Sequence, residues 1–252
     1  MQIFFPNKIL RPFVKRYMIM ESDHGMHNTI LPDTSIVMAF RFKGAVSYSE
    51  AGIEASLPES VITGIRHSAR IVHYSKQAAL LLVVFHDGGA APFFSVPMHE
   101  LSGMSVSLDD LVPHHYIEEQ LSEAASHAQR IAIVERFLMK QLKMESNDAL
   151  VQDAIQQIYA SNGTIRIKGL LTSLPVSRDP FEKRFRRITG TSPKHFAAIV
   201  RLRRVVEQYS PTKSLTDMAY TAGYFDQSHF IKDFRRFTGQ TPHEFFKSPL
   251  YW

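Results

Sequence analysis

The chain has 252 residues, 44% of them hydrophobic, which is enough for two modest domains that each bury a core. It has no cysteine, which excludes disulfide frameworks, thiolate zinc sites and cysteine nucleophiles. The net charge of +5 is unevenly placed: residues 1–149 carry 13 Lys and Arg against 16 Asp and Glu, and residues 150–252 carry 16 against 8. A basic C-terminal part suits a polyanion such as nucleic acid, although a solvated basic surface explains the charge equally well.

The sequence gives no sign of a membrane or secretory segment. No uncharged apolar run reaches the ~20 residues that a membrane-spanning helix requires. The first residues, MQIFFPNKILRPF, lack the apolar core and the cleavage site of a signal peptide. We therefore expect a cytoplasmic protein without membrane contact.

Short β-type runs separated by turn residues occupy the region from Ile36 to about Phe94. Residues 70–75 alternate as in a half-exposed strand, whereas residues 80–85 are apolar on both faces and should form a central strand. We predict a β-rich regulatory domain at residues 1–106, an antiparallel sandwich or small barrel of cupin-like type. The runs are SIVMAFRF, GAVSYS, SVITGI, RIVHYS and AALLLVVF.

A helical pattern replaces the β pattern after Pro97. Residues 107–146 are predicted to be a helical connector, which packs on its own sheet or, alternatively, on a second copy of the chain. The polar segment MESNDA at 144–149 is the predicted linker to a C-terminal domain at 150–248. The apolar stripe of the connector consists of Ile131, Val134, Phe137, Leu138 and Leu142.

The C-terminal region contains an internal repeat with an offset of 49 residues. FEKRFRRITGTSPKHF at 181–196 aligns with FIKDFRRFTGQTPHEF at 230–245, with nine identities in sixteen positions. In each copy two Phe residues spaced i and i+4 form an inward stripe, and Lys and Arg residues project from other faces. Each copy then has a glycine that ends the helix and a Ser-Pro or Thr-Pro pair that starts the next one: Gly190 with Ser192-Pro193, and Gly239 with Thr241-Pro242.

A shorter helix and a tight turn precede each copy. In the second unit residues 214–217 resemble a capping box, Gly223 provides the turn and Asp226 caps the next helix. In the first unit Ser177 is the cap, and the inward positions are Leu170, Leu171 and Leu174. Helix, turn and helix is the layout of the helix-turn-helix motif, whose second helix, the recognition helix, enters the major groove.

Residues 193–208 are predicted to form one helix between the two units, roughly 24 Å long at ~1.5 Å per residue. Such a helix is long enough to set two recognition helices on successive major-groove segments, which are about 34 Å apart. The sequence therefore predicts an all-α domain of two helix-turn-helix units joined by a linker helix.

The second unit closely resembles the AraC/XylS family of bacterial transcription regulators from Ser214 to Phe246. The matching residues are Ala219, Gly223, Asp226, Ser228, Phe230, Phe234, Gly239 and Pro242. The first unit resembles the family more loosely, through Leu170, Ser177, Phe181, Phe185, Gly190, Ser192, Pro193 and Arg201-Leu202. The segments ILPDTSIVM and FHDGGAAPFFSVPMHEL are similar to the sensing domains of some members. The resemblance implies double-stranded DNA as a partner, with RNA polymerase, a small-molecule effector and a second copy of the chain as further candidates.

The first unit departs from the family pattern at three positions. Leu171 stands where the family usually has a small residue, and Pro175 stands where it has Gly or a similar turn-former. Pro180 falls within the first recognition helix, where it is compatible only with the first turn, whose N–H groups have no intrahelical partner. These departures leave open whether the first unit contacts bases.

The exposed polar residues of the two recognition helices are the candidate DNA contacts. Gln227 suits adenine, while Lys232 and Arg235 suit phosphate or guanine. A plain solvated helix face is the alternative for any single residue, because a groove helix uses only about 3 or 4 base-reading side chains. The candidates are Arg178, Asp179, Glu182, Lys183, Arg186, Gln227, Ser228, His229, Lys232, Arg235 and Arg236.

Histidines are the main argument for a metalloenzyme, because His114-His115 and His24-x-x-His27 look like metal ligands. No carboxylate stands at a spacing that completes such a site, and HExxH, GxSxG, P-loop and dinucleotide-binding motifs are absent. We expect no metal, no cofactor and no catalytic residue.

The sequence thus predicts an α+β multidomain transcription regulator and not an enzyme. One alternative is a β-barrel enzyme or metal-dependent catalyst fused to a DNA-targeting module, which stoichiometric metal in the purified protein would favour. Another is a regulator without a ligand, whose β domain only dimerises. The operator, the effector and the choice between activation and repression stay open.

Overall fold

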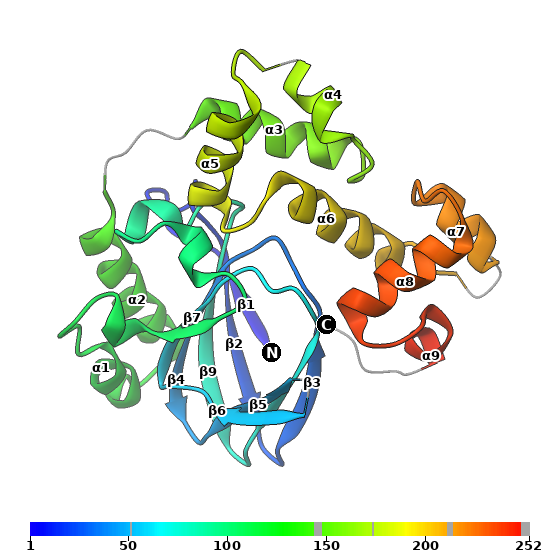
Figure 1. Cartoon of the computed structure of the whole chain (residues 1–252). Helices are drawn as coiled ribbons and strands as arrows, with labels where there is room; N and C mark the ends of the chain where they lie inside the picture. The colour runs from blue at the N-terminus through cyan, green and yellow to red at the C-terminus, as the bar shows by residue number, and fades with distance from the viewer. Residues whose placement is uncertain (51, 144–147, 173, 211–213, 248–252) are drawn as a thin grey trace.

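The structure, a computed structural model, describes residues 1–50, 52–143, 148–172, 174–210 and 214–247. A β-sandwich forms the N-terminal part and helices form the remainder (Figure 1). The strands are β1 (Gln2–Phe4), β2 (Val14–Ser22), β3 (Met26–Ile30), β4 (Val37–Lys43), β5 (Val46–Glu50), β6 (Ile53–Ser56), β7 (Ser60–Thr63), β8 (Arg70–Tyr74), β9 (Ala78–Phe85) and β10 (Ser105–Ser107).

The helices begin after the last long strand. They are α1 (Ile117–Glu123), α2 (His127–Gln141), α3 (Ala149–Ala160), α4 (Ile167–Thr172), α5 (Arg178–Thr189), α6 (Pro193–Glu207), α7 (Leu215–Thr221), α8 (Gln227–Thr238) and α9 (Pro242–Lys247). Three short 3-10 helices precede them: η1 (Ala91–Phe93), η2 (Met98–Leu101) and η3 (Leu108–Asp110). Within the described ranges, none of these helices has both the length and the apolar character needed to span a bilayer.

Two antiparallel sheets form the sandwich. The six-stranded sheet has the order β1-β2-β9-β4-β7-β10, and the four-stranded sheet has the order β3-β8-β5-β6. The predicted sandwich is therefore confirmed, and β9 lies between β2 and β4, as expected for an apolar central strand. The sequence prediction missed β1, β2 and β3, which precede Ile36, and also β6 and β10, the last of which lies after Pro97, where a helical pattern was expected. These strands are short or contain charged or polar residues that interrupt the apolar pattern.

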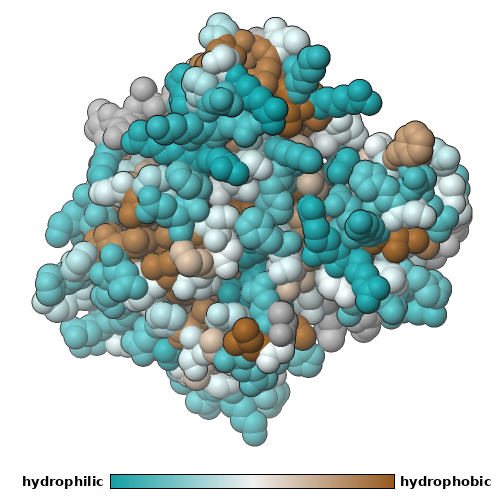
Figure 2. All heavy atoms as spheres, in the orientation of Figure 1, coloured by the Kyte–Doolittle hydropathy of each residue, from teal (hydrophilic) through white to brown (hydrophobic). Residues whose placement is uncertain are grey.

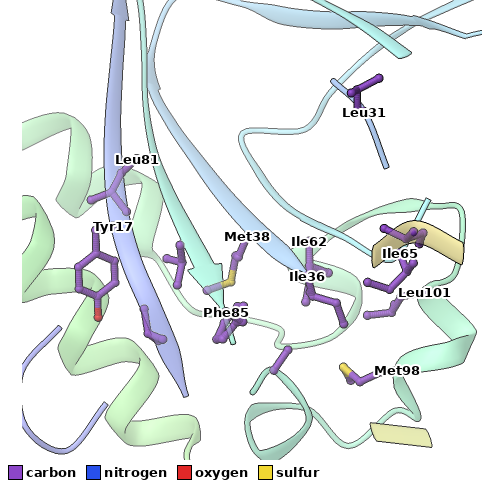
Figure 3. Packing of buried hydrophobic residues seen from close by; sticks show 14 of the residues in the cluster. Tyr17, Leu31, Ile36, Met38, Ile62, Ile65, Leu81, Phe85, Met98 and Leu101 are labelled. Carbon is purple, nitrogen blue, oxygen red and sulfur yellow. The ribbon is translucent and has the colours of Figure 1, made fainter. Parts of the chain in front are cut away.

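The six-stranded sheet is buried on both faces, which explains why β9 is apolar throughout. One face packs on the four-stranded sheet through Met20, Val46, Val72, Tyr74, Ala78 and Leu80. The other face belongs to a larger core that includes Tyr17, Met38, Phe40, Leu81 and Phe85. Figure 3 shows part of that core, with Met38 and Phe85 close together and Ile65 beside Leu101. Burial of both faces removes the alternation expected of a half-exposed strand.

The predicted connector consists of the short 3-10 helix η3 followed by α1 and α2. Its apolar stripe packs on the chain's own sheet, because Ile131, Val134 and Leu138 are buried in the core that contains Phe40. The Phe137 ring meets the Phe40 ring edge-on, with centroids 6.2 Å apart. Most of the predicted linker at 144–149 lies outside the described residues, which resume at 148.

The two C-terminal units have separate cores that share α6. The first core joins α3, α4, α5 and one side of α6. The second unit packs on α6 through residues such as Leu202 and Val205, and its core is continuous with that of the sandwich. Figure 1 shows α6 between α3–α5 on one side and α7–α9 on the other. The linker helix predicted at 193–208 is confirmed as α6, which ends at Glu207 with Gln208 as its cap.

Two glycines give opposite expectations for substitution by alanine. A Cβ at Gly64 would lie 2.1 Å from the Leu101 carbonyl oxygen, so the backbone must shift, whereas a Cβ at Gly169 in α4 meets nothing within 4 Å. We expect Gly64→Ala to lower the free energy of unfolding by about 1–3 kcal/mol through overpacking. Gly169→Ala should raise it by about 0.5–1 kcal/mol, because alanine loses less conformational entropy in a helix. Urea denaturation measures both, and equal stability of the two variants would contradict the close approach at Gly64.

Candidate nucleic-acid interface

Helices α7 and α8 form the second helix-turn-helix unit. Gly223 in the turn has a φ of 74°, and a Cβ there would lie 2.6 Å from a threonine side chain, so glycine is required. The Asp226 side chain caps α8 by accepting a hydrogen bond from the His229 N–H at 2.7 Å. Phe230 and Phe234 are 0% and 1% exposed, as predicted. Burial of this aromatic stripe fixes which side of α8 faces solvent.

The solvent face of α8 carries the predicted DNA contacts of the second unit. Gln227 is half-exposed, and its Oε1 accepts a hydrogen bond from the Thr216 hydroxyl at 3.0 Å. Arg236 is partly engaged, since its Nη2 lies 3.5 Å from Asp233 Oδ1 and its guanidinium lies over the Phe237 ring. The exposed candidates are Ser228, His229, Lys232, Arg235 and Arg236. These side chains can offer hydrogen-bond donors and positive charge to a duplex groove.

Helices α4 and α5 form the first unit in the same way. Phe181 and Phe185 are buried, and Gly190 ends α5 in the left-handed region with a φ of 89°. Ser177 occupies the N-cap position, as predicted, but its side chain makes no capping hydrogen bond. Pro180 is the third residue of α5, within the first turn, where its missing N–H costs no helical hydrogen bond.

The candidate contacts of the first unit lie on the exposed side of α5. Arg178 Nε donates to Glu182 Oε1 at 2.9 Å, so these two candidates pair with each other. The remaining exposed candidates are Asp179, Lys183 and Arg186. Figure 2 shows strongly hydrophilic residues over both α5 and α8, the two recognition helices that flank α6 in Figure 1. Whether these side chains contact DNA stays a prediction.

An acid in the middle of α8 fixes this helix to α6. Asp233 Oδ2 accepts hydrogen bonds from Arg201 Nη2 at 3.2 Å and from the Tyr224 hydroxyl at 3.1 Å. The Arg201 guanidinium also lies 4.2 Å from the centre of the Tyr224 ring. Burial raises the pKa of Tyr224 to about 12, so its hydroxyl stays a donor at neutral pH. The recognition helix is therefore positioned by polar contacts as well as by its aromatic core.

The segment from residue 65 to residue 70 of the sandwich contacts the second unit directly. The Ala69 N–H donates to the Phe237 carbonyl at 2.7 Å, near the end of α8. The His67 and His195 rings lie 4.6 Å apart, and His195 also packs on Phe237. Sequence reasoning missed these contacts, because the residues carry no motif and lie far apart in the chain.

A second set of polar contacts joins the sandwich to α3 and α6. The Tyr159 hydroxyl donates to Asp87 Oδ2 at 2.9 Å and lies 2.9 Å from the Thr34 hydroxyl. Asp33 forms an ion pair with Arg203 of α6 at 2.9 Å. Burial raises the pKa of Asp87. In the sequence no motif marks Asp87 as a partner of α3.

A cavity of about 200 Å³ lies between the two sheets. Its wall is mainly aliphatic, with residues such as Leu31, Val72 and Leu82. Two buried arginines also line it, Arg66 and Arg70, with 7% and 8% exposure. Burial lowers the pKa of Arg66 to about 10, and its Nε has no hydrogen-bond partner in the described structure. The sequence did not identify these arginines as candidates.

A cluster of titratable groups surrounds His115 at the edge of the sandwich. Its ring nitrogens each lie 3.2 Å from a carboxylate oxygen, one of Asp109 and one of Glu118, and the Ser60 hydroxyl donates to Glu118. One atom from each of Asp109, His115 and Glu118 lies within 4.8 Å of the others. The sequence spacing did not show this grouping of carboxylates with one of the predicted ligand-like histidines. One imidazole and two carboxylates can hold a divalent cation, and the same arrangement is equally compatible with a purely structural contact between His115 and two acids.

Comparison with known proteins matches both parts of the chain. Residues 170–248 match a family described as a helix-turn-helix domain, and residues 2–107 match a domain of unknown function (DUF6597). The chain is 27% identical over 180 residues to the Msm operon regulatory protein of Streptococcus mutans, covering 68% of this chain and 62% of that protein. The chain thus spans less than two thirds of the length of this curated relative.

Matches among solved structures are more distant in sequence. A structure of ToxT from Vibrio cholerae is 13% identical, with 92% of this chain and 96% of that chain covered and a TM-score of 0.48. A structure of the xylose-binding transcription activator XylR is 20% identical, with 47% of this chain and 37% of that chain covered and a TM-score of 0.36.

The His195 contact predicts a dependence of stability on pH. Burial, followed by the neighbouring His67, lowers the pKa of His195 to about 4 from its ordinary value of 6.5. Because the unfolded chain binds this proton more readily, the stabilising contribution is complete above pH 6.5 and is lost as the pH falls towards 4. The other charged groups that act on His195 are Arg236 and Asp233.

We expect His195→Gln to reduce the loss of unfolding free energy between pH 7 and pH 5 by about 1–2 kcal/mol relative to the unmodified chain. Urea denaturation at both pH values measures this difference. His229→Gln, at an exposed position of α8, is the matched control, and its unfolding free energy should change between pH 7 and pH 5 as in the unmodified chain. An unchanged pH dependence in His195→Gln would show that His195 does not titrate in this way.

Proposed function

The chain belongs to the AraC/XylS family of transcription regulators, and from this premise we propose that it regulates transcription by binding specific DNA sequences in the bacterial cytoplasm. In this proposal residues 1–106 are the regulatory domain, residues 107–146 the connector and residues 150–248 the DNA-binding domain. RNA polymerase and a second copy of the chain are proposed partners of the DNA-bound protein. Nothing in the family assignment points to an enzyme.

The duplicated recognition helix is the observation that carries this proposal. Both α5 and α8 bury a pair of phenylalanines and expose a basic and polar face. In such an arrangement cations contact phosphates and set the affinity, while side chains at the N-terminal end of the helix contact base edges and set the sequence preference. Gln227 and His229 stand at the N-terminal end of α8, and Lys232 stands one turn further along.

Two substitutions on α8 should separate base contact from phosphate contact. The probe is a duplex recovered by in vitro selection from random double-stranded DNA with the full chain. We expect Gln227→Ala to weaken binding to this duplex about 5- to 100-fold and to leave binding to unrelated DNA nearly unchanged. Lys232→Ala should weaken both to a similar degree and lower the slope of affinity against salt concentration by about one unit.

Electrophoretic mobility shift titrations across a salt series measure all of these quantities. An equal loss on selected and unrelated DNA in Gln227→Ala would refute its base contact. Salt-independent binding of the unmodified chain, or failure of the selection to enrich any sequence, would refute the proposed function itself.

We further infer that a small molecule acts on the regulatory domain in the cavity between the sheets. Among the charged residues of its wall, Asp33 pairs with Arg203 and Arg41 pairs with Glu59. Arg66 and Arg70 remain, and the nearby carboxylate of Glu50 is 3.7 Å from Arg66 Nη1. Arg70 donates to the Ser105 hydroxyl at 2.8 Å and lies over the Tyr48 ring.

Arg66 and Arg70 carry two positive charges and Glu50 supplies one negative charge, so one positive charge is in excess beside the aliphatic wall. A buried charge without a counter-ion is costly, and an anionic ligand removes that cost. The ligand that fits is therefore a monoanion with an apolar body, such as an aliphatic carboxylate. Its carboxylate would contact Arg66 and Arg70, and the Arg66 carbonyl lies 3.4 Å from His195 Nε2 in α6. Arg66 would therefore link a bound ligand to the DNA-binding domain, because its side chain lines the cavity and its carbonyl contacts His195.

Octanoate is the probe for this effector class, and 1-octanol is its uncharged match. We expect calorimetric titration to show octanoate binding that Arg70→Met weakens about 10- to 100-fold, as for loss of a hydrogen bond to a charged group. Arg70→Lys, which keeps the charge, should keep part of the binding. Octanol that binds as tightly as octanoate, or Arg70→Met that binds octanoate normally, would contradict the anion assignment without affecting the DNA-binding proposal.

A further inference from the structure

Phe225 has the most exposed large hydrophobic side chain in the part of the chain that the structure describes, with 86% of its surface accessible. It stands directly before Asp226, the residue that caps α8. A phenyl ring left in water forgoes the hydrophobic stabilisation that burial would provide. Its exposure at the entrance of a recognition helix therefore calls for a physical reason.

The usual structural role of an apolar residue at this position is not fulfilled. A hydrophobic residue before the N-cap commonly packs on the fourth residue of the helix, as a hydrophobic staple. For α8 that fourth residue is Phe230, which is fully buried and packs on Tyr224, with ring centroids 5.3 Å apart. Since Tyr224 already occupies this place, the exposed Phe225 does not serve as a staple.

The first helix-turn-helix unit supplies an internal comparison. At the offset of 49 residues, Phe225 corresponds to Val176, which stands before the N-cap Ser177. Val176 is half-buried and packs against the core that contains Phe181, the fourth residue of α5. The first copy of the motif thus uses its apolar residue for internal packing, whereas the second copy presents a larger one to solvent.

The residues on either side hold Phe225 in its outward position. The Tyr224 side chain is 4% exposed, and its hydroxyl is hydrogen-bonded to Asp233. The Asp226 side chain is held by the His229 N–H at 2.7 Å. With both neighbours fixed, Phe225 cannot turn inward without breaking the cap or removing Tyr224 from the core. Its ring is therefore presented to solvent at the N-terminal end of α8.

We propose that Phe225 contacts the C5-methyl group of a thymine in the major groove and so determines one position of the recognised sequence. The proposal rests on the proposed DNA-binding function. The N-terminal end of a recognition helix lies nearest to the base edges. The thymine methyl is the apolar group that the major groove presents there, and phenylalanine is one of the side chains that contact it.

Replacement of single thymines by uracil tests this contact, because uracil lacks only the methyl group. The DNA is the duplex selected with the full chain, substituted at one thymine at a time. For the unmodified chain we expect one uracil substitution to weaken binding by roughly 3- to 10-fold. Phe225→Ala should weaken binding to the thymine duplex by a similar factor and abolish the difference between thymine and uracil at that position.

Two further variants exclude indirect effects. Phe225→Leu keeps an apolar contact and should keep part of the thymine preference. Tyr220→Ala removes another exposed aromatic ring, 65% accessible, from the neighbouring helix α7 and should leave the thymine preference unchanged. Circular dichroism and thermal unfolding of Phe225→Ala should match the unmodified chain, because the ring contributes little to the folded core.

The outcomes separate this inference from the function on which it rests. If selection yields a specific duplex but no uracil substitution depends on Phe225, the methyl contact is wrong and DNA recognition stands. If Phe225→Ala lowers binding to unrelated DNA by the same factor, the ring does not read a base, and the inference is likewise overturned. If no sequence is enriched, the proposed function fails first.

Discussion

The packing of α6 between two cores is the constraint on which the arrangement of the molecule depends. One side of α6 places Phe196 and Val200 in the core of the first unit, and another places Leu202 and Val205 in the core that includes the second unit. A close-packed interface tolerates little sliding, because displaced side chains leave voids or overlap. The separation of α5 and α8 is therefore set by one rigid helix of 15 residues and not by a flexible connection.

The same helix also contacts the sandwich, so it lies between the cavity proposed to bind an effector and the surface proposed to bind DNA. Arg203 pairs with Asp33, which lines the cavity, and His195 contacts the carbonyl of Arg66, another lining residue. Two residues at different points along α6 are thus bonded to the wall of one cavity. A ligand shifts the position of α6 only if it binds one position of the helix and the cavity wall more tightly than another.

The C-terminal fold could be predicted because its signals are local in the sequence. The repeat and the 3.6-residue period place the aromatic stripes, Gly190 and Gly239 mark helix ends, and Ser192 and Asp226 cap helices. Central strand β9 was predictable from its apolar run, whereas β1 to β3 and β6 have weaker patterns. The exposed faces of α5 and α8 followed from the buried stripe. Other features depend on tertiary geometry and cannot be predicted from sequence spacing. They are the pairs Tyr159–Asp87 and His67–His195, the cavity lined by Arg66 and Arg70, and the exposure of Phe225.

Residues 65–70 lie between the cavity of the sandwich and the end of α8. The side chains of Arg66 and Arg70 face the cavity, while the Ala69 N–H holds the carbonyl of Phe237 at the end of α8. Phe230, Phe234 and Asp233 anchor α8 along its length, so this hydrogen bond acts on a helix that is fixed to its core. In the proposed regulation, a ligand in the cavity therefore acts on α8 through a direct contact between the sandwich and the second unit.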